Sequence, residues 1–248
     1  MEAARPSNSS SLVFSSSGAF LMCLTGSHNV LTYYLPIYFQ AIKGVAAASS
    51  ALYGLPLIVS VIPVSIISGV AVTVMGYYTP FIILSSVLVT AGTGLLSTFT
   101  LYTRAEQWIG FQAIYGLGLG VGTHQPLVAA QTVLSHEDIP LGMAPLVFFQ
   151  TLGGAVFVSV AQNVFTNRLR VGLISQVSGV DPATVLSSGA ANLRSTVDPE
   201  FLSAVLVVYN EALVSAIQVA LGLACLSFVG AFVMEWKSVK LKAAQKHT

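Results

Sequence analysis

The sequence has very little charge for its length. Only 8% of its 248 residues are Asp, Glu, Lys or Arg, whereas 54% are hydrophobic. Soluble domains carry about 25% charged residues because their surfaces must be hydrated, so this chain needs a different solvent, and lipid fits. The net charge of +1 also excludes the basic field that nucleic-acid binding requires.

Cysteine is equally scarce, with Cys23 and Cys225 as the two in the chain. Both lie in apolar runs, far from any His or Cys at the spacing of metal ligands, which excludes a zinc site and a disulfide framework. No combination of Ser, His and Asp suits acyl transfer either. We therefore predict no metal, no cofactor and no enzymatic activity.

Long apolar runs without charge make up most of the chain. A helix needs about 20 residues to cross a bilayer core, and a run of this kind is too long and too uniformly apolar for a membrane β-strand. The runs cover residues 12–38, 51–74, 81–101, 108–134, 143–165 and 212–234. The predicted fold class is an all-α integral membrane protein whose six transmembrane helices form one bundle.

The first run could instead be read as a cleaved signal peptide. It ends, however, in aromatic residues that suit the membrane interface better than a cleavage region. These residues are Tyr33, Tyr34, Tyr38 and Phe39. We therefore expect the first run to be a membrane span with an aromatic belt at its end.

The segments between the runs carry nearly all the charge. Residues 1–11 form a polar start, residues 167–209 form the one long loop, and residues 236–248 form a basic tail. Asp181-Pro182 and Asp198-Pro199 each predict a helix start, because Asp caps a helix and Pro is tolerated at its first position. Basic residues divide evenly between the two sides, but the lysines behind the last run favour cytosolic termini and an external long loop.

Polar side chains inside the apolar runs are the candidates for function, because lipid penalises them unless they face a partner or a cavity. Gln112 and Tyr115 share one helical face of the fourth run, and His124 lies on another. Each of these side chains could instead be a packing residue bonded to a neighbouring helix. His124, and with less weight His28, could take up a proton at membrane depth.

Small residues in the fourth run predict close helix packing. The run holds two overlapping GxxxG pairs, and it does not match a dinucleotide-binding loop because no strand precedes it. The pairs are Gly116 with Gly120 and Gly118 with Gly122. We assign Gly153 and Gly154 of the fifth run to the same packing role. Pro126 removes a backbone hydrogen bond and predicts a kink beside His124 and Gln125.

Several segments together resemble one family of carriers. The segment YYLPIYFQ begins at Tyr33, QPL begins at Gln125, FQTLGG begins at Phe149, and MEWK begins at Met234. In order and spacing they are similar to segments of the fungal fourteen-helix drug:proton antiporter branch of the major facilitator superfamily. The similarity extends over about residues 31–240.

The resemblance implies the carboxy-terminal six helices of a plasma-membrane efflux carrier for a drug, toxin or secondary metabolite. Its partners would be membrane lipid, a small amphipathic substrate and an amino-terminal half of six to eight helices. The implied cavity-facing residues are Tyr34, Gln112, Tyr115, His124, Gln125 and Gln150. The alternative is a truncated remnant, or a structural or partner-binding membrane subunit, that transports nothing.

Overall fold

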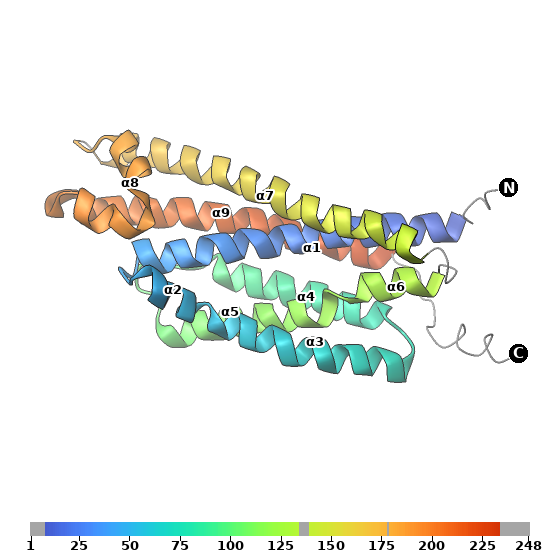
Figure 1. The fold of residues 1–248 in the computed structure, drawn as a ribbon. Coiled ribbons are helices and arrows are strands. Elements are labelled where there is room, and N and C mark those ends of the chain that lie inside the picture. Colours follow the sequence, from blue (N-terminus) through green and yellow to red (C-terminus); the bar gives the residue numbers. More distant parts are fainter. Residues whose placement is uncertain (1–7, 134–138, 178, 234–248) are drawn as a thin grey trace, which may run out of the picture.

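The structure is a computed structural model that describes residues 8–133, 139–177 and 179–233. Every regular element in these ranges is a helix, which confirms the predicted all-α class. The helices are α1 (Asn8–Ala41), α2 (Ala47–Tyr53), α3 (Leu55–Met75), α4 (Thr79–Leu96), α5 (Ala105–Gly122), α6 (Gln125–Val133), α7 (Ile139–Gln176), α8 (Pro182–Thr196) and α9 (Pro199–Val233). The long helices lie side by side along one axis (Figure 1). The start of α1 and the end of α9 lie at one end of this bundle, and α2 and α8 lie at the other end.

Four helical segments are long and apolar enough to cross a membrane. They are Ala47–Met75, Thr79–Leu96, Ile139–Gln176 and Pro199–Ala231. The other two predicted spans fall on α1, which is rich in serine, and on the α5–α6 pair, which is interrupted at residues 123–124. The prediction of six spans is thus supported for four segments and stays a prediction for the other two.

The predicted long loop is largely helical. Helix α7 continues to Gln176, beyond residue 165 where the predicted span ends, and α9 begins at Pro199. The polar residues after 165 ended the apolar run but not the helix, because a helix that leaves the membrane can expose polar side chains to water. Helix α8 starts at Pro182 as expected, with the Asp181 carboxylate accepting the backbone N–H of Ala183 at 3.1 Å.

Helix α1 lies in the middle of the bundle and packs on α7 and α9. Helix α4 packs on α5 and α9, and α3 packs mainly on α5.

The expected aromatic belt at the end of α1 was wrong in part, because Tyr34, Tyr38 and Phe39 are fully buried while Tyr33 is 49% exposed. Rings from α1, α2 and α5 meet there edge to face, with Phe39 and Trp108 5.1 Å apart between centroids. These rings join the core because other side chains cover them. Tyr34 packs on Phe165 of α7, Tyr38 on Phe99 and Phe39 on Tyr53 of α2.

The glycines of α5 face two different helices. A Cβ on Gly116 or Gly120 would come within 2.6 Å or 2.7 Å of a backbone oxygen of α3. A Cβ on Gly118 would lie 2.6 Å from the Val89 nitrogen of α4, and one on Gly122 would meet Ser85 of the same helix. One GxxxG pair therefore packs on α3 and the other on α4, so that α5 is held between them.

The α1–α7 crossing uses Gly153 and Gly154 in the same manner. A Cβ on Gly153 would meet the Met22 carbonyl oxygen, and one on Gly154 would lie 2.6 Å from the amide nitrogen of Asn29.

The outer faces of the bundle are apolar, as on α3, where Val59, Ile66 and Ile67 are each more than 60% exposed. An exposed surface of this composition suits contact with lipid or with another apolar surface.

Candidate functional site

Two cavities lie between α1, α3 and α5. We call them cavity A, of 170 Å³, and cavity B, of 270 Å³. Helices α1, α3, α5 and α7 and the α5–α6 junction line cavity A, and its polar residues are Thr25, His28, Ser65, Thr123, His124 and Gln150. Helices α1, α2, α3 and α5 line cavity B, and its polar residues are His28, Thr32, Ser50 and Gln112. No Asp, Glu, Lys or Arg is among the described residues that line either cavity.

His28 is the one polar residue that the two cavities share. Its ring stacks on Tyr115 of α5, with centroids 6.5 Å apart and an angle of 15° between the planes. Its Nδ1 atom is buried and has no hydrogen-bond partner among the described residues. The imidazole therefore stands at the junction of two cavities with one polar atom unsatisfied.

Gln112 brings a second unsatisfied atom to cavity B. Its Nε2 atom donates a hydrogen bond of 3.0 Å to the Tyr53 carbonyl oxygen, which fixes the amide. Its Oε1 atom is buried and has no partner within the described part of the chain. His28 and Gln112 thus both line cavity B, and each has one buried polar atom without a partner among the described residues.

His124 lies at a break between α5 and α6. Residues 123 and 124 form a turn, and Pro126 occupies the first turn of α6, where its missing N–H has no helical partner to lose. The Thr123 hydroxyl donates to the Leu119 carbonyl oxygen at 2.6 Å and satisfies one group at the end of α5. The break leaves His124 exposed in the wall of cavity A, together with Gln150 from α7.

The other predicted cavity residues lie in the packed interior and line neither cavity. The Tyr34 hydroxyl donates to Oε1 of Gln162 at 2.9 Å, which joins α1 to α7. The amide of Gln125 donates to the Val121 carbonyl oxygen of α5 at 3.1 Å. Tyr115 is fully buried beneath His28, and its hydroxyl faces Ser27. Of the six predicted residues, the structure therefore brings His124 and Gln150 together in cavity A and places Gln112 in cavity B.

Most of the cavity-lining hydroxyl groups were not predicted from the sequence. Thr25, Ser65 and Thr123 line cavity A, and Thr32 and Ser50 line cavity B. Thr123 shares a helical face of the fourth run with Gln112 and Tyr115, but serine and threonine are so frequent in the apolar runs that nothing singled out the other four. His28 was given less weight than His124, and the spacing of Thr25, His28 and Thr32 by three and four residues places these three on one face of α1.

The described residues contain no group of three His, Cys, Asp or Glu side chains that could hold a metal ion. Cys23 and Cys225 are both free thiols. The chemistry that these cavities offer is hydrogen bonding and apolar contact. Fold and cavities together define a helical membrane bundle with an apolar exterior and uncharged internal cavities.

Comparison with known proteins identifies the family. The MFS-type efflux pump MFS1 of Arthroderma benhamiae is 49% identical over 227 residues, which cover 91% of this chain and 42% of that protein. The MFS-type transporter astH of Aspergillus oryzae is 47% identical, with 89% of this chain and 39% of that protein covered. The aspyridones efflux protein of Neocamarosporium betae is 47% identical, with 91% and 40% covered. No family model matches the chain.

These identities extend along almost the whole chain. The chain therefore belongs to the major facilitator superfamily of transporters, as the resemblance of its segments implied. It spans about two fifths of the length of the relatives that it matches.

Proposed function

We propose that the chain supplies one helical bundle of an efflux carrier that exports a small amphipathic molecule, such as a drug, toxin or secondary metabolite. The observation that carries this proposal is the identity of 47–49% with proteins named as efflux pumps or transporters. The uncharged cavities A and B agree with it, because they offer hydrogen bonds and apolar surface to such a molecule. A membrane protein that transports nothing is the less favoured alternative.

Transport in this family proceeds by one bundle moving against another around a central site. By resemblance, this chain corresponds to the carboxy-terminal bundle, and the partner bundle would be an amino-terminal half. Cavities A and B lie between α1, α3 and α5, and a second bundle would complete their walls. We place the carrier in the plasma membrane with membrane lipid around it, and we propose proton antiport as its driving force.

The decisive experiment compares two proteins in sealed vesicles. One is the 248-residue chain alone, and the other is the product of a longer reading frame that contains it together with an amino-terminal half. We expect the long protein to export a fluorescent amphipathic dye when a proton gradient is applied, and the short chain to insert without exporting it. Export by the short chain would overturn the two-bundle proposal, and a long protein that moves no dye or metabolite from a broad panel would overturn the efflux proposal.

The proposed orientation has its own test. Cytosolic termini place α8 outside the cell and the tail inside. A cysteine introduced at Ser188 should react with an impermeant maleimide applied to intact cells, whereas one at Ser238 should react only after permeabilisation. Cys23 and Cys225 are replaced by Ser or Ala beforehand, so that they do not contribute signal. The reverse pattern of labelling would refute the orientation.

A further inference from the structure

An open apolar groove runs between α1 and α9 on the outside of the bundle. Its volume is 380 Å³, and it is separate from cavities A and B. Helix α1 lines one side with residues between Ser15 and Cys23, and α9 lines the other side with residues between Leu226 and Gly230. We call it the α1–α9 groove. None of the described residues that line it is charged.

Small residues keep the groove open. Ala19 and Gly230 have almost no side chain to fill the space between the two helices, and even a Cβ on Gly230 would be in ordinary contact with Phe20, 3.5 Å away. Leu226 and Val229 also line the groove and are 58% and 61% exposed. A narrow apolar surface of this kind suits a hydrocarbon chain, because such a chain gains apolar contact along the whole groove and has no polar groups to satisfy.

The groove leads to the end of the bundle where α1 begins and α9 ends (Figure 1). Ser15 lies eight residues nearer to the start of α1 than Cys23, which is about 12 Å along the helix. The hydroxyl-bearing residues of the wall, Ser15 and Ser16, are therefore at this end, and the apolar residues lie deeper. This order of polar and apolar parts is that of the headgroup and the acyl chain of a membrane lipid.

Lysines follow soon after α9 in the sequence. Residues 234–248 contain Lys237, Lys240, Lys242 and Lys246 but a single acidic residue, Glu235. The chain cannot carry the first of these lysines more than about 14 Å from the last residue of α9, because four peptide units separate them. A cluster of four lysines beside a membrane helix attracts anionic lipid. A lipid with net negative charge thus matches the groove by its acyl chain and the lysines by its phosphate.

We propose that the α1–α9 groove binds one anionic phospholipid, with an acyl chain in the groove and the phosphate close to the lysines of the tail. A zwitterionic lipid would fill the apolar part equally well but would gain less from the lysines. Glu137 and Asp138 connect α6 to α7, and neither of these helices lines the groove. The inference goes beyond the proposed efflux function and does not depend on it, because it concerns the outside of the bundle rather than cavities A and B.

Quenching of tryptophan fluorescence by brominated lipid tests the proposal on the full chain. Trp108 and Trp236 are replaced by Phe, and one tryptophan is introduced at Val229 in the α1–α9 groove. The protein is reconstituted in mixtures of phosphatidylcholine and phosphatidylglycerol in which one of the two lipids carries bromine on its acyl chains. Comparison of the two labelling schemes gives the relative affinity of the anionic and the zwitterionic lipid at this position.

A second groove on α9 supplies the matched control. It has a volume of 310 Å³ and lies between α4 and α9, where its lining residues include Val87, Cys225 and Phe228. The last two lie eight and five residues before the end of α9, whereas Gly230 lies three residues before it, so this second groove is farther from the lysines. A single tryptophan at Val87, which is 46% exposed, reports on the lipid there.

Phosphatidylglycerol should bind about fivefold more strongly than phosphatidylcholine at Val229→Trp, which is the factor that one lysine near a membrane surface contributes. The two lipids should bind about equally at Val87→Trp. Replacement of Lys237, Lys240 and Lys242 by Gln should remove the preference at Val229→Trp, and about 1 M salt should reduce it, because salt screens the lysines.

A variant that fills the groove tests the position of the acyl chain. Ala19→Phe should reduce quenching at Val229→Trp by both lipids, because the ring would occupy the groove. Ala155→Phe, at an exposed position of α7, should leave this quenching unchanged. Circular dichroism verifies the helical content of each variant. If Trp108→Phe fails to fold, Trp108 is kept in all variants, where it adds the same background to each.

Several results would overturn the inference. They are equal affinity of the two lipids at Val229→Trp, the same preference at Val229→Trp and Val87→Trp, a preference that survives replacement of the lysines, or quenching that Ala19→Phe does not reduce. A tryptophan at Val229 that neither lipid quenches, while the one at Val87 is quenched, would also overturn it. That result would mean that another protein surface, such as a second copy of the chain, covers the groove.

Discussion

Alanine at Gly120 should destabilise the bundle, whereas alanine at Gly110 of the same helix should stabilise it. A Cβ on Gly120 would lie 2.7 Å from the Val61 carbonyl oxygen and 3.1 Å from the Val64 Cβ. The first of these atoms belongs to the backbone of α3, so it cannot rotate away, and α3 and α5 must separate. A Cβ on Gly110 would meet nothing within 4 Å.

The comparison of the two variants isolates the packing energy. Both substitutions gain the roughly 0.5–1 kcal/mol by which alanine favours a helix over glycine, so this gain cancels in their difference. What remains is the cost of overpacking, about 1–3 kcal/mol. We expect Gly110→Ala to be more stable than wild type by the helical gain, and Gly120→Ala to be less stable than Gly110→Ala by the overpacking cost.

Reversible unfolding in mixed micelles, driven by SDS and followed by far-ultraviolet circular dichroism, measures the difference. Gly118→Ala extends the test to the other face of α5, where a Cβ would lie 2.6 Å from the Val89 nitrogen of α4. It should be destabilised like Gly120→Ala. Equal stability of Gly120→Ala and Gly110→Ala would refute the claim that the GxxxG pairs set the helix spacing.

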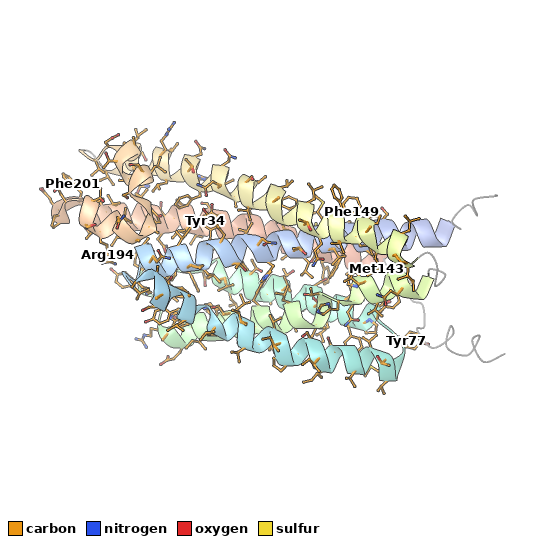
Figure 2. All side chains as sticks on the ribbon, viewed as in Figure 1. Tyr34, Tyr77, Met143, Phe149, Arg194 and Phe201 are labelled. Carbon is orange, nitrogen blue, oxygen red and sulfur yellow. The ribbon has the colours of Figure 1, made fainter. Side chains whose placement is uncertain are left out.

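Three further predictions concern the end of the bundle that carries α2 and α8. Arg194 donates to the carbonyl oxygens of Ile42 at 2.6 Å and Ala41 at 3.3 Å, and Figure 2 shows it where α8 lies beside the end of α1. Because these hydrogen bonds hold α8 on α1, Arg194→Gln should speed amide exchange in α8 by about tenfold. The control Arg170→Gln on α7 should not change this exchange. The Ala183 N–H, and after it the Thr184 hydroxyl and N–H, donate to the Asp181 carboxyl and lower its pKa below the ordinary 3.8. The cap is therefore complete above 3.8 and is lost as the pH falls through the lowered pKa. Asp181→Ala should reproduce at neutral pH the faster amide exchange at Ala183 and Thr184 that acid causes. Lys43 donates to the carbonyl oxygens of Leu101 and Thr103, both at 2.8 Å, so Lys43→Met should lower the free energy of unfolding by about 1.5–3 kcal/mol. Burial lowers the pKa of the Lys43 ammonium, so the wild-type free energy of unfolding should rise with pH just below 10.5, and a rise of equal size in Lys43→Met would contradict this.

The sequence by itself determined the class of the protein. A chain with 8% charged and 54% hydrophobic residues has too few polar groups for a soluble surface, and helices satisfy their own backbone in lipid, so an all-α membrane bundle follows from composition and run length. Local chemistry also fixed the starts of α8 and α9, because a capping carboxylate followed by proline acts within one helical turn. The GxxxG spacing also predicted close helix packing, because residues four apart lie on one face of the same helix.

Only the tertiary structure decided which helix meets which face and which polar side chains share a cavity. The two glycine pairs of α5 look alike in the sequence, yet one faces α3 and the other faces α4. Gln125 and His124 are neighbours in the chain, but the break before α6 buries the first and exposes the second. His28 borders both cavities, and the Tyr115 ring of α5 stacks on its imidazole. These outcomes depend on contacts between residues tens of positions apart, and periodicity within a single helix carries no information about the rotation of its neighbours.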